Sequence, residues 1–479
     1  MKLLIYRCGI MACALALVLG WTAASARDAG PNRHDAVTSR VNTQLPDITP
    51  GKHVTLGEAL SAADQRSPSL AAARADIARA RADLERSWAV LIPSAKGTLT
   101  HTHNDHEDTT TFSSGSPDLY EALGIEPPPS REIVVRRQDD LSGALQVSAP
   151  IINAQSWMNV HATRMGVEVS RLTVENVRQE LLMAVAQTYY QALNANALIK
   201  VQEAQFYAAV RHMKVAMFKY ESGVGQRLDY VRARTEVVNT RQSLLAAHSA
   251  LDNARDALGV LTGLGGLPYP SEAPRLDVPV EDEKELVSKA HNQRTDLRAK
   301  RAGVEMSRRQ LEASWMQFLP TLDATWQLTH RFTDPSGFGS TEATRWAAVF
   351  MLTVPIYNQI RYADLDRNRA LLKKARLEAE DAKQSTAMEV RRAGRDFHVA
   401  MAQVNAAEEQ VVLTREATTL AEAAYESGTG DSLAVTDARR SSREAEVMLA
   451  TRRFEAQLAL LQLMRSVGVD MAGIAERNK

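Results

Sequence analysis

The densest group of side chains able to do chemistry lies between His101 and Asp108, a stretch with three histidines, two aspartates and one glutamate. Imidazoles and carboxylates at this density are good ligands for zinc or copper. The sequence then continues through Thr- and Ser-rich residues to Pro127-Pro128-Pro129, a composition typical of an exposed loop. We therefore interpret the histidines from His101 to His106 as part of a solvated extracellular loop and expect no resident metal or cofactor. Metal binding by this loop stays open as the alternative.

No other pattern predicts catalysis or nucleic-acid binding. The chain has no Walker loop, dinucleotide fingerprint or catalytic serine elbow. Its 57 Lys and Arg residues balance 57 Asp and Glu residues, so there is no global basic field to attract nucleic acid. We expect a protein that is not an enzyme. Its 479 residues would suggest about three domains from length alone.

Residues 1–26 have the features of an export signal. Lys2 and Arg7 form a basic start, Ile10 to Trp21 is apolar, and Ala24-Ser25-Ala26 offers a cleavage site between small residues. An uncleaved membrane anchor is the alternative, but the apolar stretch is short for a span. Both cysteines, Cys8 and Cys13, precede this site, so the exported chain would contain neither a disulfide nor a free thiol.

The sequence contains an internal duplication, so two repeats replace the estimate of three domains. The matching segments keep their order in the two halves, and the longest match is separated by 205 residues. The pairs are Tyr220–Gly225 with Tyr425–Gly430, Ala149–Asn153 with Val354–Asn358, and Ser87-Trp88 with Ser314-Trp315. The third pair has an offset of 227, so the first half carries about 22 additional residues between Pro93 and Pro150.

Each half contains a long helical stretch, followed after a Gly-x-Gly turn by a second helix that runs back. Apolar residues in these stretches recur every three or four positions, and helix-breaking residues are nearly absent. About 65 helical residues would extend roughly 100 Å, which a compact globule cannot contain. The predicted hairpins pair 167–222 with 227–258 and 356–427 with 432–467.

The other part of each half predicts one helix and two strands. Helix-start signals at Ser67-Pro68 and Thr295-Asp296 open helices that end near Pro93 and Pro320. Apolar and polar residues then alternate at period two in 141–149, 321–328 and 346–354, although Val349 and Met351 make the second face of the last segment less polar. The segment 94–102 is a weaker, Thr-rich strand. Strands of about ten residues cross a bilayer obliquely.

Four spanning strands would leave two unpaired edges, and lipid offers these edges no hydrogen-bond partner. Several chains must therefore contribute strands to one shared barrel. The alternative is a four-stranded sheet with one wet face in a soluble periplasmic coiled-coil scaffold or adaptor.

This order of elements resembles the TolC-like outer-membrane efflux protein family, from about Val54 to Val467. The motifs that carry the resemblance are the tip segments Tyr220–Asp229 and Tyr425–Asp437, with Pro150-Ile151 and Pro355-Ile356 after the second and fourth strands. The resemblance implies a mainly α homotrimer in which long hairpins form a tunnel and four strands per chain form a twelve-stranded barrel. It also implies a passive duct of a tripartite efflux or type I secretion system in the outer membrane of a Gram-negative bacterium. Its partners would be a periplasmic adaptor, an inner-membrane pump and outer-membrane lipid.

Site residues are carried over from the family by position. Asp229 follows Gly223 by six residues, and Asp437 lies beyond the second turn, so both are expected to ring the periplasmic aperture. The sequence departs from the family at Ala434 and Gly430, which leaves open whether the family's aperture lock operates. The turns expected to dock the adaptor contain Tyr220, Gly223, Gly225, Tyr425, Gly428 and Gly430.

The expected organisation follows from these boundaries. Two structural repeats, 54–263 and 282–468, are joined by a linker at 264–281. The signal peptide (1–26) and an N-terminal extension (27–53) precede the first repeat, and a tail (469–479) follows the second.

Overall fold

A computed structural model describes residues 50–112, 117–126, 131–271, 282–333 and 342–474. The expected signal peptide and most of the 27–53 extension lie outside these residues. So do most of the 264–281 linker and the end of the 469–479 tail.

Helices dominate the unit from Ile48 onward, and the two halves match in length pair by pair. The matching pairs have 11, 22, 68 and 36 residues respectively. They are α1 (Leu56–Arg66) with α6 (Glu283–Gln293), α2 (Pro68–Ala89) with α7 (Thr295–Met316), α4 (Ala154–Glu221) with α8 (Gln359–Glu426), and α5 (Arg227–Thr262) with α9 (Ser432–Val467).

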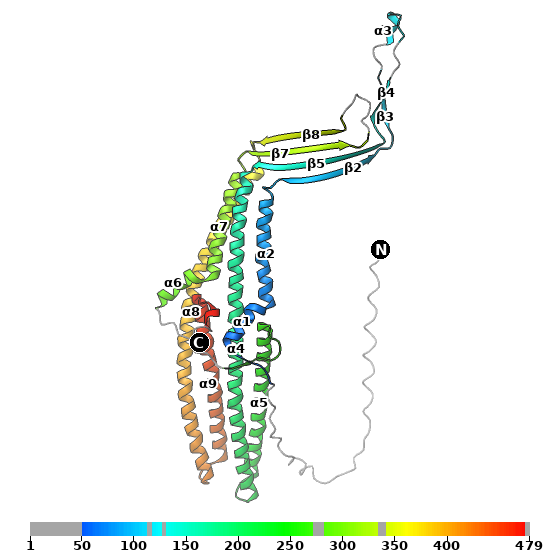
Figure 1. Cartoon of the computed structure of the whole chain (residues 1–479). Coiled ribbons are helices and arrows are strands. Elements are labelled where there is room, and N and C mark those ends of the chain that lie inside the picture. The colour runs from blue at the N-terminus through cyan, green and yellow to red at the C-terminus, as the bar shows by residue number, and fades with distance from the viewer. Residues whose placement is uncertain (1–49, 113–116, 127–130, 272–281, 334–341, 475–479) are drawn as a thin grey trace, which may run out of the picture. The chain divides into compact units, whose positions relative to one another are not determined.

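The long helices α4 and α8 each extend about 100 Å at 1.5 Å per residue. Toward one end α4 packs between α2 and α7, and toward the other it packs beside α5 and α9 (Figure 1). The predicted hairpins are confirmed, although α4 begins at Ala154 and continues through Gly166.

The four predicted strands form one antiparallel sheet in the order β2-β5-β7-β8 at the far end of α2, α4 and α7 (Figure 1). Its strands are β2 (Ser94–His103), β5 (Asp139–Ile152), β7 (Thr321–Arg331) and β8 (Thr344–Thr353). Strands β2 and β8 are the two edges, and in the described residues neither edge has a second neighbour.

The insertion in the first half differs from the loop that we expected. His101 and His103 belong to β2, because the antiparallel pairing with β5 continues to Asp139. Beyond it, β3 (Asp108–Phe112) and β4 (Arg131–Arg136) form a second hairpin, with the short helix α3 (Pro117–Ala122) between them. The Thr-rich composition of β3 allowed either reading, since threonine favours strands as well as exposed loops.

The principal core lies where the short helices meet the long ones. The chain enters at β1 (His53–Val54), which pairs with β6 (Tyr269–Pro270). A reciprocal capping box between Thr55 and Glu58 then starts α1. Tyr189 and Tyr190 of α4 are fully buried there, and the short η2 helix (Met471–Ile474) closes the described chain.

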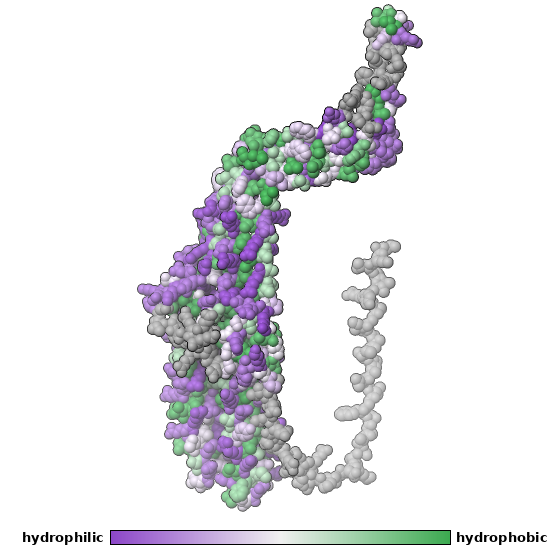
Figure 2. Space-filling view, in the orientation of Figure 1, coloured by the Kyte–Doolittle hydropathy of each residue, from purple (hydrophilic) through white to green (hydrophobic). Residues whose placement is uncertain are grey.

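No helix among the described residues is both long and apolar enough to cross a membrane. The outer surfaces are uneven in polarity: hydrophilic residues dominate beside α7, whereas hydrophobic residues gather along the four-stranded sheet (Figure 2).

Candidate functional site

The two helical tips have the same turn geometry. Gly223 and Gly428 adopt φ angles of 72° and 82°, a left-handed conformation that glycine adopts without strain. Gly225 and Gly430 are required for a different reason. A Cβ at Gly225 would lie 2.9 Å from Lys219 Cβ, and one at Gly430 would lie 2.9 Å from the carbonyl carbon of Ala424. The Gly-x-Gly spacing therefore provides one left-handed residue and one close approach to the preceding helix.

The tips contact each other through a side chain present only in the first half. Lys219 of α4 reaches across to α8, where its Nζ donates a 2.8 Å hydrogen bond to the Tyr425 carbonyl oxygen. The same ammonium group lies 3.8 Å from the centroid of the Tyr425 ring. At the offset of 205 the residue equivalent to Lys219 is Ala424, so this contact has no counterpart in the second half.

The two tyrosines have different surroundings. The Tyr425 ring is buried at 7% exposure and lies edge-on to His212, whereas the Tyr220 ring is 42% exposed and stacks on Tyr230. Burial, followed by the charge of Asp229, raises the pKa of the Tyr425 hydroxyl. Of the two predicted docking tyrosines, only Tyr220 therefore presents much of its surface in the single chain.

The predicted aperture carboxylates lie in or just beyond the first turns of the returning helices. Asp229 is half-buried in the first turn of α5 and close enough to Tyr425 to act on its charge state. Asp437 is exposed on α9 and lies 3.3 Å from the guanidinium group of Arg440 on the same helix. The structure thus brings Asp229 to the contact between the tips, while Asp437 shares its charge with a local arginine.

Above the tips, further polar contacts join the two hairpins. Arg439 of α9 donates to the Ala208 carbonyl at 2.9 Å and also bonds Glu422 of α8 at 2.7 Å. Gln205 of α4 donates to Glu446 of α9 at 2.7 Å, and Arg443 of α9 pairs with Glu236 of α5.

His212 is enclosed by this group of contacts. It is buried at 5% exposure, and its Nε2 has no hydrogen-bond partner among the described residues. Burial, reinforced by the charge of Arg439, lowers the pKa of the imidazole to about 4. His212 is therefore neutral at physiological pH and packs as an aromatic side chain against Tyr425.

These contacts between the hairpins are not predicted from the sequence. They join residues of the two repeats at unequal positions, which periodicity within one helix does not reveal. The sequence does hold one signal of this contact: the two tip motifs match, but the residue before the tyrosine is Lys219 in the first half and Ala424 in the second.

The four-stranded sheet has one apolar face and one more polar face, which on β8 also carries Val349 and Met351. Residues paired across adjacent strands share a face, and alternate residues of a strand lie on opposite faces. One cross-strand row contains Leu145, Leu328 and Trp346, and the next contains Lys96, Gln146, Gln327 and Ala347. The apolar face also carries Leu99, Trp326 and Phe350, which suits contact with lipid, while the polar face suits an aqueous lumen.

Helix α8 has two apolar stripes. Val390, Phe397, Val404 and Val411 are buried within the chain. Val399 lies two residues from Phe397, about 200° around the helix, and is 55% exposed. The stripe on this opposite side, which is unpaired in a single chain, contains Leu377, Met388, Val399, Leu413 and Leu420.

The histidine-rich stretch forms two small groups near the end of β2. His103 Nδ1 lies 2.8 Å and His101 Nε2 lies 3.5 Å from the same oxygen of Asp139 on β5. His106 contacts Asp105 at 2.9 Å and Asp108 at 3.0 Å. Among the described residues, no group of three or more potential ligands is arranged to hold a metal ion.

Comparison with known proteins gives one consistent family. Residues 59–264 and 286–469 match the family described as outer membrane efflux protein. Outer membrane protein TolC of Vibrio cholerae is 23% identical over 347 residues, which cover 70% of this chain and 78% of the relative. The cobalt-zinc-cadmium resistance protein CzcC of Cupriavidus metallidurans is 24% identical over 325 residues, covering 65% of this chain and 73% of the relative. A solved membrane protein from Pseudomonas aeruginosa has the same fold, with a TM-score of 0.71 at 21% identity over 86% of this chain and 93% of that one.

Proposed function

The chain belongs to the outer membrane efflux protein family, and from this membership we propose that three copies assemble into one export duct. The protein is a passive outer-membrane efflux channel that extends into the periplasm, and it is not an enzyme. The trimer, its partners and the roles of individual residues are our proposals.

The observation that carries the trimer proposal is the pair of open sheet edges. Strands β2 and β8 each expose a row of backbone hydrogen-bonding groups at the ends of a sheet with one apolar face. In hydrocarbon each unpaired group costs several kcal/mol, so β2 of one copy would pair with β8 of the next. Three copies contribute twelve strands, a number in the range of known membrane barrels.

The helices support the same closure. The exposed stripe of α8 faces away from its own hairpin partner, and α5 carries half-exposed Val231, Val238 and Leu245. Burial of one such side chain contributes about 1.5–3 kcal/mol, so packing between α8 of one copy and α5 of the next would be favourable. A closed ring of hairpins would place the tips of α4 and α8 around one periplasmic opening.

At that opening we propose that Asp229 and Asp437 line the aperture and favour cations. The turns containing Gly223, Gly225, Gly428 and Gly430, together with Tyr220 and Tyr425, would dock a periplasmic adaptor. The adaptor would join this duct to an inner-membrane pump that supplies the energy.

The proposal is tested by membrane flotation and gel mobility of the exported protein. We expect the protein to float with outer membranes and to migrate as a trimer that heating converts to monomer. A protein that stays with the soluble periplasmic fraction as a monomer would instead support the coiled-coil scaffold.

A further inference from the structure

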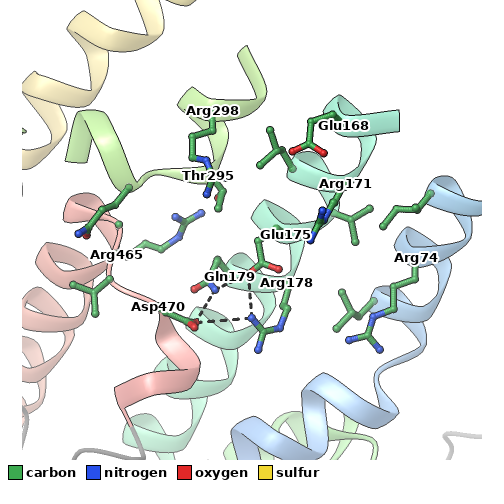
Figure 3. Close-up of a pocket in the computed structure, with 17 residues that line it drawn as sticks. Arg74, Glu168, Arg171, Glu175, Arg178, Gln179, Thr295, Arg298, Arg465 and Asp470 are labelled. Carbon is green, nitrogen blue, oxygen red and sulfur yellow. Dashed lines mark hydrogen bonds and ion pairs between the residues drawn. The ribbon is translucent and has the colours of Figure 1, made fainter. Parts of the chain in front are cut away.

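A cavity of about 640 Å³ lies away from the tips, where α2, α4 and α7 meet the end of α9 (Figure 3). Five arginines line it: Arg74, Arg171, Arg178, Arg298 and Arg465. They come from both halves of the chain, so the cavity is a feature of the assembled fold that no single sequence motif indicates.

Two of these arginines are neutralised within the structure. Arg178 makes a bidentate pair with Asp64, with both contacts at 2.9 Å, and also bonds Glu175 at 3.0 Å. Arg74 bonds the same Asp64 carboxylate at 2.9 Å. These pairs hold α1, α2 and α4 together and leave little charge for a ligand.

The other three arginines make no ion pair with any described residue. Arg171 and Arg298 are exposed, and Arg465 donates one hydrogen bond to the neutral Asn176 amide oxygen at 2.8 Å. Figure 3 labels all three among the side chains that line the cavity, with Arg298 on α7, Arg465 on α9 and Arg171 on α4. Charge-assisted hydrogen bonds to a carboxylate, sulfonate or phosphate are the interactions that free guanidinium groups make best.

The surroundings of Arg465 favour an added anion. Burial, and next the charge of Arg294, lowers the pKa of Arg465, while the carboxylates of Asp296, Glu180 and Glu389 act in the opposite direction. Helix α7 begins at Thr295 on the cavity wall and directs the positive end of its dipole there. Three carboxylates also line the cavity: Glu175 is paired with Arg178, whereas Asp470 accepts hydrogen bonds only from the neutral Gln179 and Ala472 amides, so Asp470 and Glu168 are two opposing charges against the three arginines.

One part of the wall is apolar and is formed by Leu70, Ile77, Leu172, Val174 and Val469. A small inorganic ion would leave this surface uncovered. A cavity of several hundred Å³ with an apolar wall and a few charged groups suits an organic molecule.

We propose that this cavity is a binding site for an amphipathic organic anion, with its acidic group on Arg171, Arg298 and Arg465 and its apolar body against Leu70 and Ile77. The bound molecule would link helices from both repeats. This site is independent of the tip and of the export function.

The test is calorimetric titration of the intact, detergent-solubilised protein with 2-naphthalenesulfonate. Neutral 2-naphthol serves as the matched probe, and protein-free micelles give the background. We expect saturable binding of the sulfonate only. Arg171→Gln and Arg298→Gln should each weaken it by about tenfold or more, the loss expected for one charge-assisted hydrogen bond.

Arg395→Gln, an exposed arginine of α8 outside the cavity, is the control and should leave the affinity unchanged. Thermal melts followed by circular dichroism would verify that Arg171→Gln and Arg298→Gln are folded. The proposal is overturned if the sulfonate shows no saturable binding, if 2-naphthol binds equally well, or if the folded arginine variants bind like the wild type.

Discussion

Lys219→Ala tests how the two hairpins are held together at the tips. The substitution gives the first half the residue that the second half has at Ala424. It removes the 2.8 Å hydrogen bond to the Tyr425 carbonyl and the cation 3.8 Å from the Tyr425 ring, but leaves both backbone turns unchanged.

The size of the effect follows from these two contacts. A hydrogen bond involving a charged group contributes about 1.5–3 kcal/mol, and an exposed cation–π contact about 0.5–1 kcal/mol. Solvent screens the half-buried lysine, so we take a combined loss of about 1–2 kcal/mol. That loss corresponds to roughly a 5- to 30-fold shift toward separated tips in each chain.

The assay is single-channel recording in planar bilayers. We expect Lys219→Ala to spend several-fold more time in high-conductance states than the wild type. Lys214→Ala is the matched control, because Lys214 is an exposed lysine on the same helix. Equal open times for both variants and the wild type would show that the Lys219 contact does not hold the tips together.

Three further predictions concern the tips and the stability of the hairpins. Asp437→Ala should reduce cation selectivity and divalent-ion block in the same recordings, but only partly because Arg440 already shares the charge, and unchanged selectivity would exclude Asp437 from the aperture. Gly428 has a φ of 82°, so Gly428→Ala should lower the free energy of unfolding by about 1–2 kcal/mol in denaturant titrations. Gly303 lies inside α7, where an added Cβ meets nothing within 4 Å, so Gly303→Ala should raise that free energy by about 0.5–1 kcal/mol. His212 has a pKa of about 4 in the folded chain, against 6.5 for the ordinary side chain. Between these values the unfolded chain binds a proton at His212 that the folded chain does not, so the stability of the fold should decrease as the pH drops from about 6.5 to 4. His212→Phe should flatten that part of the pH profile, and an unchanged slope would contradict the assignment.

The sequence allowed most of the fold to be predicted because its signals are local and repeated. Period-two alternation located β5, β7 and β8, and a weaker Thr-rich pattern located β2. The Gly-x-Gly turns located the ends of α4 and α8 within a residue or two. The β3–β4 hairpin was read as loop because Thr-rich exposed strands lack the alternation that a half-buried strand shows.

The site was predictable only as a set of turns. The glycines could be recognised because each half needs one residue with a left-handed backbone and one residue without a Cβ close to the preceding helix. The contact of Lys219 with Tyr425 and the burial of His212 depend on how one hairpin lies against the other. Such packing between elements has no sequence period, and the same holds for the cavity lined by Arg171, Arg298 and Arg465.

Disulfide cross-linking can show whether edge strands of different copies pair into one barrel. Thr98→Cys on β2 would be combined in turn with a cysteine at each position of β8, and the exported wild-type chain would serve as the thiol-free control. We predict that at least one pair yields covalent dimers and trimers on a non-reducing gel. Monomers alone from every pair, with both thiols accessible to a labelling reagent, would contradict the shared barrel.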